Sequence, residues 1–181
     1  LDDGVIVEEL AVEGFTWQQL PLALTPAAPP RAGNQQTAID EWADAVLSAV
    51  PRLPDDPATD ILRRRPPRTR GGVLAPVVGG DEVAAITETV ADLDHSYLAV
   101  QGPPGTGKTY VGSHVIARLV RERGYRVGVV AQGHATVEHL LDRVIDAGVP
   151  AAQVAKAPKD PAAAHAFTVI PKAGVAAFTA E

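Results

Sequence analysis

The chain has 181 residues, of which 46% are hydrophobic, so it is long enough for one domain or one and a half with an ordinary core. It contains no cysteine, which excludes disulfides, cysteine-ligated zinc and iron–sulfur clusters from this segment. It also has no signal peptide and no apolar run of the roughly 18 residues that a membrane span needs, so we expect no membrane partner.

The formal net charge of −6 is unevenly distributed along the chain. Residues 1–60 hold eleven acidic and two basic side chains, whereas residues 61–181 hold eleven acidic and fourteen basic ones. We interpret the acidic part as a solvated face. The chain also lacks methionine and ends inside an apolar, alanine-rich stretch, which leads us to expect a segment of a longer protein.

Residues 1–72 are predicted to form a small α+β accessory region with linkers. Alternation of apolar and polar residues predicts a strand within residues 4–13. Trp17 is expected in a core, because a large aromatic side chain is more often buried than used as a ligand platform. Several prolines then indicate a linker that runs to Gly33.

Two helices are expected in the second half of this region. An apolar stripe at helical spacing predicts the first over residues 37–50, with Thr37 and Asp40 as a capping pair. Asp56 followed by Pro57 predicts the start of a second, short helix, because aspartate accepts backbone hydrogen bonds at a cap and proline suits the first helical position.

A basic run with five arginines in eight residues follows, at residues 63–70. One interpretation is a strip that contacts phosphates, because arginine presents a planar fork of donors to a phosphate group. The other is an exposed linker, or arginines that pair with acidic side chains of the first sixty residues. Under the first interpretation, charge reversal at Arg64 and Arg68 should flatten the salt dependence of nucleic-acid binding.

From residue 73 onward, strands and helices are expected to alternate. This βαβα pattern predicts an α/β domain with a parallel sheet and helices on both faces. The expected helices run from an Asp81 cap to Leu93, from Tyr110 to a stop at Gly124, and from Val137 to a stop at Gly148. The expected strands are Tyr97–Val100 and Arg126–Ala131, with further short strands at Val154–Lys156 and Val175–Phe178.

Residues 102–109, Gly-Pro-Pro-Gly-Thr-Gly-Lys-Thr, fit the P-loop pattern and lie between an expected strand and an expected helix. Glycines let successive backbone N–H groups point into one cavity, and the helix adds its own unpaired N–H groups. A glycine-rich turn without a ligand is the alternative. We predict ATP and Mg²⁺ as cofactors and Lys108 and Thr109 as catalytic residues. The predicted nucleotide-binding residues are Gly102, Pro103, Pro104, Gly105, Thr106, Gly107, Lys108, Thr109 and Tyr110.

Lys108 is expected to reach the β- and γ-phosphates, and the Thr109 hydroxyl is expected to hold Mg²⁺. A nucleotide-dependent activity without an export signal predicts a cytoplasmic location. Many classes of enzyme share a P-loop, so the function has to be argued from other segments.

Residues 129–140, Val-Val-Ala-Gln-Gly-His-Ala-Thr-Val-Glu-His-Leu, resemble motif Ia of Upf-type superfamily 1 helicases. That motif usually reads as a strand, then Ala, any residue, Ser or Thr, Asn, any residue, Ala-Val-Asp, any residue and Leu. Gly133 and His134 replace its Ser/Thr and Asn, and Thr136 stands where Ala is usual. Together with the arginine run and the P-loop, the chain resembles bacterial proteins that fuse a RecB-like nuclease to such a helicase.

This resemblance implies that residues 73–181 are the N-terminal part of a RecA-like P-loop NTPase domain in an ATP-dependent DNA or RNA helicase or translocase. It also implies that the main-chain N–H groups of Gly133 and His134 and the Thr136 hydroxyl contact phosphates of a single strand, DNA more than RNA. The remaining helicase domains would be partners. For His134, a loop histidine or local cap is the alternative, and its spacing from His139 argues against a metal site.

Several parts of such an enzyme are absent from the sequence. No glutamine occurs in residues 71–100 to select adenine, and no apolar run followed by Asp-Glu follows the P-loop to complete a Mg²⁺ site. Nuclease carboxylates of the Asp…Glu-x-Lys type are absent as well. We therefore expect the isolated chain to bind nucleotide weakly and hydrolyse little of it. An AAA+ ATPase and a non-catalytic nucleotide-binding interaction module are the alternatives.

Overall fold

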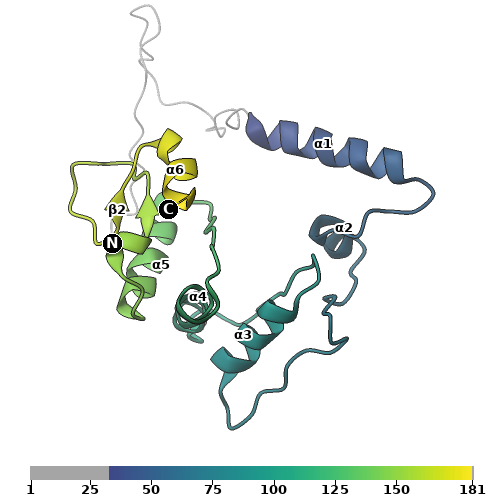
Figure 1. Ribbon diagram of the computed structural model, residues 1–181, viewed down its shortest axis with the longest axis horizontal. Helices are drawn as coiled ribbons and strands as arrows, with labels where there is room; N and C mark the ends of the chain where they lie inside the picture. The colour runs from purple at the N-terminus through teal and green to yellow at the C-terminus, as the bar shows by residue number, and fades with distance from the viewer. Residues whose placement is uncertain (1–32, 181) are drawn as a thin grey trace, which may run out of the picture. The chain divides into compact units, whose positions relative to one another are not determined.

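The computed structural model describes residues 33–180, and Figure 1 shows their helices and strands. The chain divides into two compact units, Leu1–Ser48 and Ala49–Glu181, which are described separately. The predicted strand in residues 4–13, Trp17 and most of the predicted linker lie outside the described residues. The division between residues 72 and 73 stays a prediction. No helix within residues 33–180 is long and apolar enough to cross a membrane.

Helix α1 spans Asn34–Ala49, so the helix expected over residues 37–50 is confirmed, but its start is earlier. The predicted capping pair is wrong, because Thr37 already lies inside the first turn and donates its N–H to the Gly33 carbonyl. Asp40 instead accepts a hydrogen bond from the Gln36 side chain at 2.9 Å. Helix α1 buries none of its residues, and Ile39 and Leu47 of its apolar stripe are exposed.

Helix α2, Pro57–Leu62, begins as its sequence predicts. The Asp56 carboxylate accepts hydrogen bonds from the Thr59 N–H at 2.9 Å and from the Thr59 hydroxyl at 2.7 Å. One of the orphan N–H groups at the helix start and the Thr59 hydroxyl are thereby satisfied by the same side chain. This cap fixes the position of Asp60, the residue after Thr59. The Asp60 carboxylate is the most buried polar group of the described residues.

Asp60 joins helix α2 to the chain just before the P-loop. Its side chain is 0% exposed and accepts hydrogen bonds from Arg68 Nε and Ser96 Oγ, both at 2.9 Å. Arg68 also donates to the His95 carbonyl at 2.9 Å, and the Tyr97 hydroxyl donates to the Arg65 carbonyl at 2.8 Å. We call Asp60, Arg68 and Ser96 the carboxylate clamp. It ties the arginine run to residues 93–97 by side-chain contacts.

The carboxylate clamp bears on whether the arginine run pairs with acidic side chains or stays open to contact phosphates. Arg68 pairs with Asp60, and Arg65 lies 3.6 Å from Asp55, so two of the five arginines are paired with acidic residues of the first sixty. Arg63, Arg64 and Arg70 are exposed, and their side chains have no partner within residues 33–180. The run is therefore divided between a structural role and an open basic surface.

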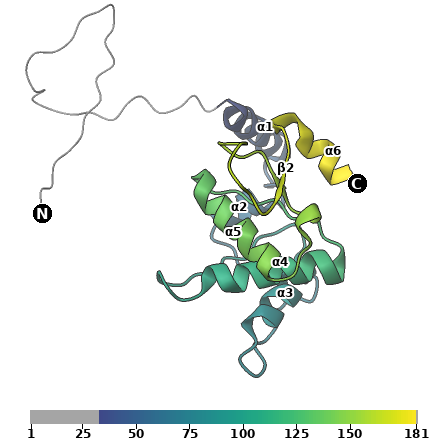
Figure 2. The same ribbon diagram turned by 90° about the vertical axis from the view of Figure 1, so that its left-hand side faces the viewer.

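Helices α3, Glu82–Asp92, and α4, Lys108–Arg123, pack against each other, and α4 also packs against α5, His134–Asp146 (Figures 1 and 2). The Asp81 carboxylate caps α3 by accepting from the Ala84 N–H at 2.8 Å, as predicted. Gly124 ends α4 in the left-handed region at φ 67°, where glycine has no steric penalty, as predicted. Gly148, at φ 98°, follows the end of α5.

The expected strands at Tyr97–Val100 and Arg126–Ala131 are wrong, since neither segment forms a strand. A strand exists only when its N–H and C=O groups pair with a neighbouring strand, and neither segment has such a neighbour among the described residues. Val130, expected in a buried strand, is 94% exposed. The local sequence favours extended chain at both places, but the ladder partner that makes a strand is a non-local requirement.

The sheet of the described residues has two short parallel strands, β1, Ala155–Lys156, and β2, Thr168–Val169, in the register Ala155 opposite Thr168. The first of these confirms the strand expected at Val154–Lys156. The strand expected at Val175–Phe178 is wrong, because these residues lie in helix α6, Val175–Ala180. Helix α6 continues directly from a 3-10 turn at Lys172–Gly174. A second 3-10 turn, Ala151–Gln153, precedes β1.

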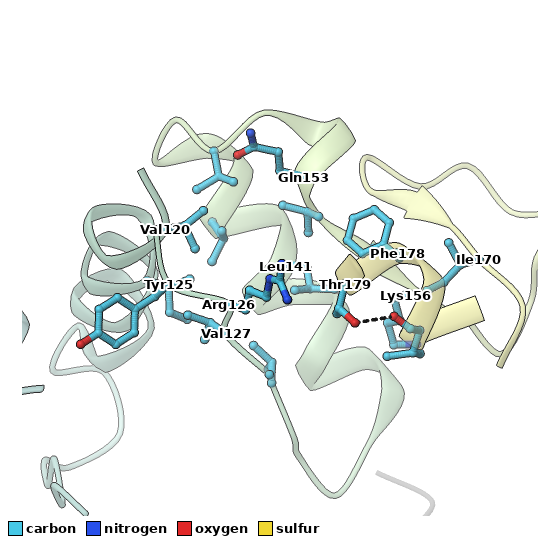
Figure 3. A pocket seen from close by; sticks show the side chains of 18 of the residues that line it. Val120, Tyr125, Arg126, Val127, Leu141, Gln153, Lys156, Ile170, Phe178 and Thr179 are labelled. Atoms are coloured by element: carbon cyan, nitrogen blue, oxygen red, sulfur yellow. Dashed lines mark hydrogen bonds between the residues drawn. The ribbon is translucent and has the colours of Figure 1, made fainter. Parts of the chain in front are cut away.

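The core lies where α4 and α5 meet the chain around the two strands. Its buried side chains include Leu141 and Val144 of α5. The full cluster is Ala117, Leu141, Val144, Val149, Val154 and Phe167. A cavity of about 750 Å³ adjoins it, and Leu141 from α5, Phe178 from α6 and Val127 line its walls (Figure 3). Helices on a small parallel sheet fit part of an α/β P-loop NTPase domain.

Candidate nucleotide site

The P-loop leads directly into α4, which begins at Lys108, two residues before the expected position. Gly107 is the residue before the helix and has φ 80°, and Gly105 has φ 82°. Both values lie in the left-handed region, which side chains other than glycine rarely adopt. No side chain caps α4, so the first N–H groups of this sixteen-residue helix stay open toward the loop.

Lys108 folds back over the loop that precedes it. Its ammonium donates to the Gly102 carbonyl at 2.5 Å and to the Pro103 carbonyl at 2.6 Å. The Thr106 hydroxyl donates to the same Pro103 carbonyl at 2.8 Å. A Cβ on Gly102 would lie 2.6 Å from the Thr106 hydroxyl oxygen, so the loop closes tightly on itself at this point. The positive charge of Lys108 is thus placed beside the open N–H groups of α4.

The next two residues extend this surface. Thr109 is exposed, and its hydroxyl has no hydrogen-bond partner among residues 33–180. Tyr110 is 62% exposed and lies against the His114 ring with 4.0 Å between ring centroids. The His114 ring also contacts the Tyr110 carbonyl through Nδ1 at 2.8 Å. The predicted nucleotide-binding residues therefore form one continuous, open surface at the start of α4.

The three residues of the motif Ia-like segment lie together at the start of another helix. Gly133, with φ −132°, precedes α5, His134 is its first residue, and Gly133, His134 and Thr136 are all exposed. Lys156 of β1 contacts this turn: its ammonium lies 2.9 Å from His134 Nδ1 and 2.8 Å from Glu138 Oε1. No hydrogen bond or ion pair joins this turn to the P-loop among residues 33–180.

Lys156 is a residue that the sequence did not indicate. Its partners lie 18 and 22 residues away, and one lysine after an apolar pair carries no pattern that would single it out. Its hydrogen bond to Glu138 lowers the pKa of that carboxyl, against the rise that burial alone would cause, and the positive charge of Lys156 lowers it further. Glu138 is therefore held as a carboxylate that anchors Lys156.

Residues 80–177, more than half of the chain, match a family described as an AAA domain. The chain belongs to this AAA domain family. The regulator of nonsense transcripts 1 of Caenorhabditis elegans is 25% identical over 105 residues, and its homolog in Neurospora crassa is 31% identical over 74 residues. These matches cover 58% and 41% of this chain but 9% and 6% of the two relatives. No solved structure matches the chain significantly.

The part that matches the AAA domain contains both the P-loop and the turn held by Lys156, whereas the arginine run lies before it. The P-loop has the features that a triphosphate needs: open N–H groups, two glycines at positive φ, and a lysine. The first turn of α4 contains no acidic side chain that would repel phosphate. The residues present therefore fit a nucleotide.

The fit for Mg²⁺ rests on Thr109 alone. Within residues 33–180, no three histidine, aspartate or glutamate side chains gather closely enough to hold a metal ion. A hydroxyl beside the phosphates suits a magnesium ion that is bound mainly by the nucleotide and by water. The carboxylate that would complete such a site is not among the described side chains around the P-loop.

Alanine substitutions at Gly107, just before α4, and at Gly112, inside α4, should change the free energy of unfolding in opposite directions. Gly107→Ala forces a side chain into the left-handed region and should lower the free energy of unfolding by about 1–2 kcal/mol. Gly112→Ala replaces a glycine inside the helix whose Cβ would meet nothing within 4 Å, and should raise it by about 1 kcal/mol. Urea unfolding followed by circular dichroism measures both, and effects of the same sign would contradict the loop conformation.

Proposed function

We propose that the chain is the ATP-binding part of an ATP-dependent helicase or translocase of the Upf-type superfamily 1 class, acting on single-stranded nucleic acid. The P-loop conformation carries the proposal: Lys108, two left-handed glycines and an uncapped sixteen-residue helix form one phosphate-binding surface. ATP with Mg²⁺ is the proposed cofactor, with Thr109 as a ligand of the ion.

The choice of a nucleic-acid motor over other P-loop enzymes is supported by the relatives. Both are named as regulators of nonsense transcripts, and transcripts are RNA. The motif Ia-like turn supplies the proposed strand contact, because exposed N–H groups at the start of α5 and the Thr136 hydroxyl suit phosphate oxygens. RNA and DNA are both to be tested, since the phosphate contacts do not distinguish them. A RecA-like domain and further helicase domains are part of the same proposal.

The test is ATP hydrolysis by the full-length protein with and without single-stranded RNA, single-stranded DNA and duplex of equal length. We expect hydrolysis to rise at least about tenfold with one single strand, since binding between two domains assembles a motor's catalytic site. Equal rates with every polymer would contradict the proposal. The AAA domain description also fits the AAA+ ATPase alternative, which predicts hexamers and no stimulation by single strands.

A second test of nucleic-acid binding uses the open basic surface formed by Arg63, Arg64 and Arg70. Arg68 is unsuitable for charge reversal, because it pairs with the buried Asp60. The double variant Arg63→Glu with Arg64→Glu should reduce the slope of log affinity against log salt by about 1.4 for a single strand, or about 0.7 per phosphate contact. Arg52→Glu, an exposed change outside the run, is the control. An unchanged slope would assign the run to solubility alone.

A further inference from the structure

All three N–H donors of the Lys156 ammonium face acceptors within the protein. Its side chain is 11% exposed, and its three N–H donors face Glu138 Oε1 at 2.8 Å, His134 Nδ1 at 2.9 Å and the Ala157 carbonyl at 3.3 Å. A lysine ammonium has three donors, so this set satisfies it. Lys156 is therefore not available to bind a phosphate directly, and its effect must act through the residues that it contacts.

The contact with His134 fixes the state of the imidazole ring. An ammonium group can only donate, so Nδ1 must accept and cannot carry a proton. The remaining proton of a neutral imidazole is then on Nε2. Within residues 33–180, Nε2 of His134 has no hydrogen-bond partner, and the side chain is exposed at the first position of α5. The ring thus presents one N–H donor to solvent.

We propose that Lys156 is a positioning residue for nucleic-acid binding: it holds His134 in the tautomer whose Nε2–H donates to a strand phosphate beside the open N–H groups of α5. This inference rests on the proposed function. The titratable groups around Glu138 are Lys156 from β1, His134 from the same helix and His165 from the segment between the two strands. Glu138 neutralises Lys156, so the pair orients the ring without adding net charge.

The decisive variant is Lys156→Met, which keeps an unbranched side chain one atom shorter and removes its donors. Lys156→Arg tests conservative rescue, and Lys159→Met, an exposed change three residues further on, is the matched control. The first measurement is the ¹⁵N chemical shifts of the His134 ring at neutral pH, which distinguish a protonated from an unprotonated nitrogen. The original chain and Lys159→Met should show the Nε2–H tautomer, and Lys156→Met should show a mixture.

The second measurement is affinity for a fluorescent single-stranded oligonucleotide at fixed salt. Lys156→Met should weaken binding about five- to tenfold, as expected for one lost phosphate hydrogen bond. In a His134→Ala background, the same change should have no further effect, because the lysine acts through the ring. Lys156→Arg should recover part of the affinity. Far-ultraviolet circular dichroism checks that each variant is folded.

The outcomes separate this inference from the proposed function. If the original chain binds the oligonucleotide but Lys156→Met leaves the ring tautomer or the affinity unchanged, the positioning role is overturned and the proposed function stands. An equal loss in the His134→Ala background would also overturn it, since Lys156 would then act independently of the ring. If the original chain does not bind the oligonucleotide, both are overturned.

Discussion

Lys108→Ala should weaken binding of a fluorescent ATP analogue with Mg²⁺ by about 10- to 100-fold. The ammonium is the positive side chain at the start of α4, and a hydrogen bond from a charged donor to phosphate is worth more than a neutral one. Lys108→Arg should lose nearly as much, because a planar guanidinium fork does not place its donors where the compact ammonium places them beside the Gly102 and Pro103 carbonyls.

The control for this prediction is Lys172→Ala, an exposed lysine in the 3-10 turn before α6, which should leave affinity unchanged. Because Lys108 also donates to two loop carbonyls, the melting temperature of each variant is measured without nucleotide. A loss of affinity without a loss of stability assigns the effect to the ligand. Equal affinity in Lys108→Ala and the original chain would contradict the nucleotide site.

Asp60→Asn should lower the melting temperature by about 10 °C. The change removes the buried negative charge of Asp60, so the Arg68 guanidinium loses its charged partner. Asp94→Asn is the matched control, since Asp94 is 4.0 Å from Arg68 and half exposed, and it should change the melting temperature by no more than about 2 °C. Similar effects of the two changes would show that burial of Asp60 is unimportant.

The same carboxylate predicts a dependence on pH. Burial alone would raise the pKa of Asp60, but hydrogen bonds from Arg68 and Ser96 and the charges of Arg68 and Arg65 hold that pKa below its usual value. A lowered folded-state pKa means that the stabilisation is complete above the unfolded-state value of about 3.9 and is lost as the pH falls through the folded-state value.

Stability of the original chain should therefore fall more steeply below about pH 4 than that of Asp60→Asn. Glu138, whose pKa is also lowered, is present in both proteins, so its contribution cancels in the comparison. Thermal melts at intervals between neutral pH and pH 3 measure the difference. Parallel curves for the two proteins would show that the clamp is not ionised or does not contribute.

Local signals in the sequence predicted local structure well. Asp56, Asp81 and Gly124 act within one turn of themselves, so each could be recognised as a cap or stop and each is found in that role. The prediction that Thr37 caps the first helix was wrong, because the Gly33 carbonyl accepts the hydrogen bonds from the N–H groups at the start of α1. The strands expected at Tyr97–Val100 and Arg126–Ala131 were wrong because pairing depends on chain far from the strand itself.

The candidate sites divide in the same way. The P-loop residues form a contiguous pattern, and their position at a helix start follows from that pattern. Lys156 and the carboxylate clamp depend on contacts between residues 8 to 36 positions apart, which no periodicity encodes. That arginines would pair with early acidic residues was one of two interpretations, but the choice of Arg68 and the participation of Ser96 needed the fold. The predicted roles of Gly133, His134 and Thr136, and the nuclease fusion, stay predictions.

The carboxylate clamp has a consequence for where the domain can be cut. The match to the AAA domain begins at residue 80, but Asp60 and Arg68 lie before it and hold Ser96 and His95, which lie within it. A shortened chain that starts at residue 80 would leave Ser96 and the Tyr97 hydroxyl without their partners at the point where the chain enters the P-loop. The unit that folds is thus longer at its N-terminal side than the unit that sequence similarity outlines.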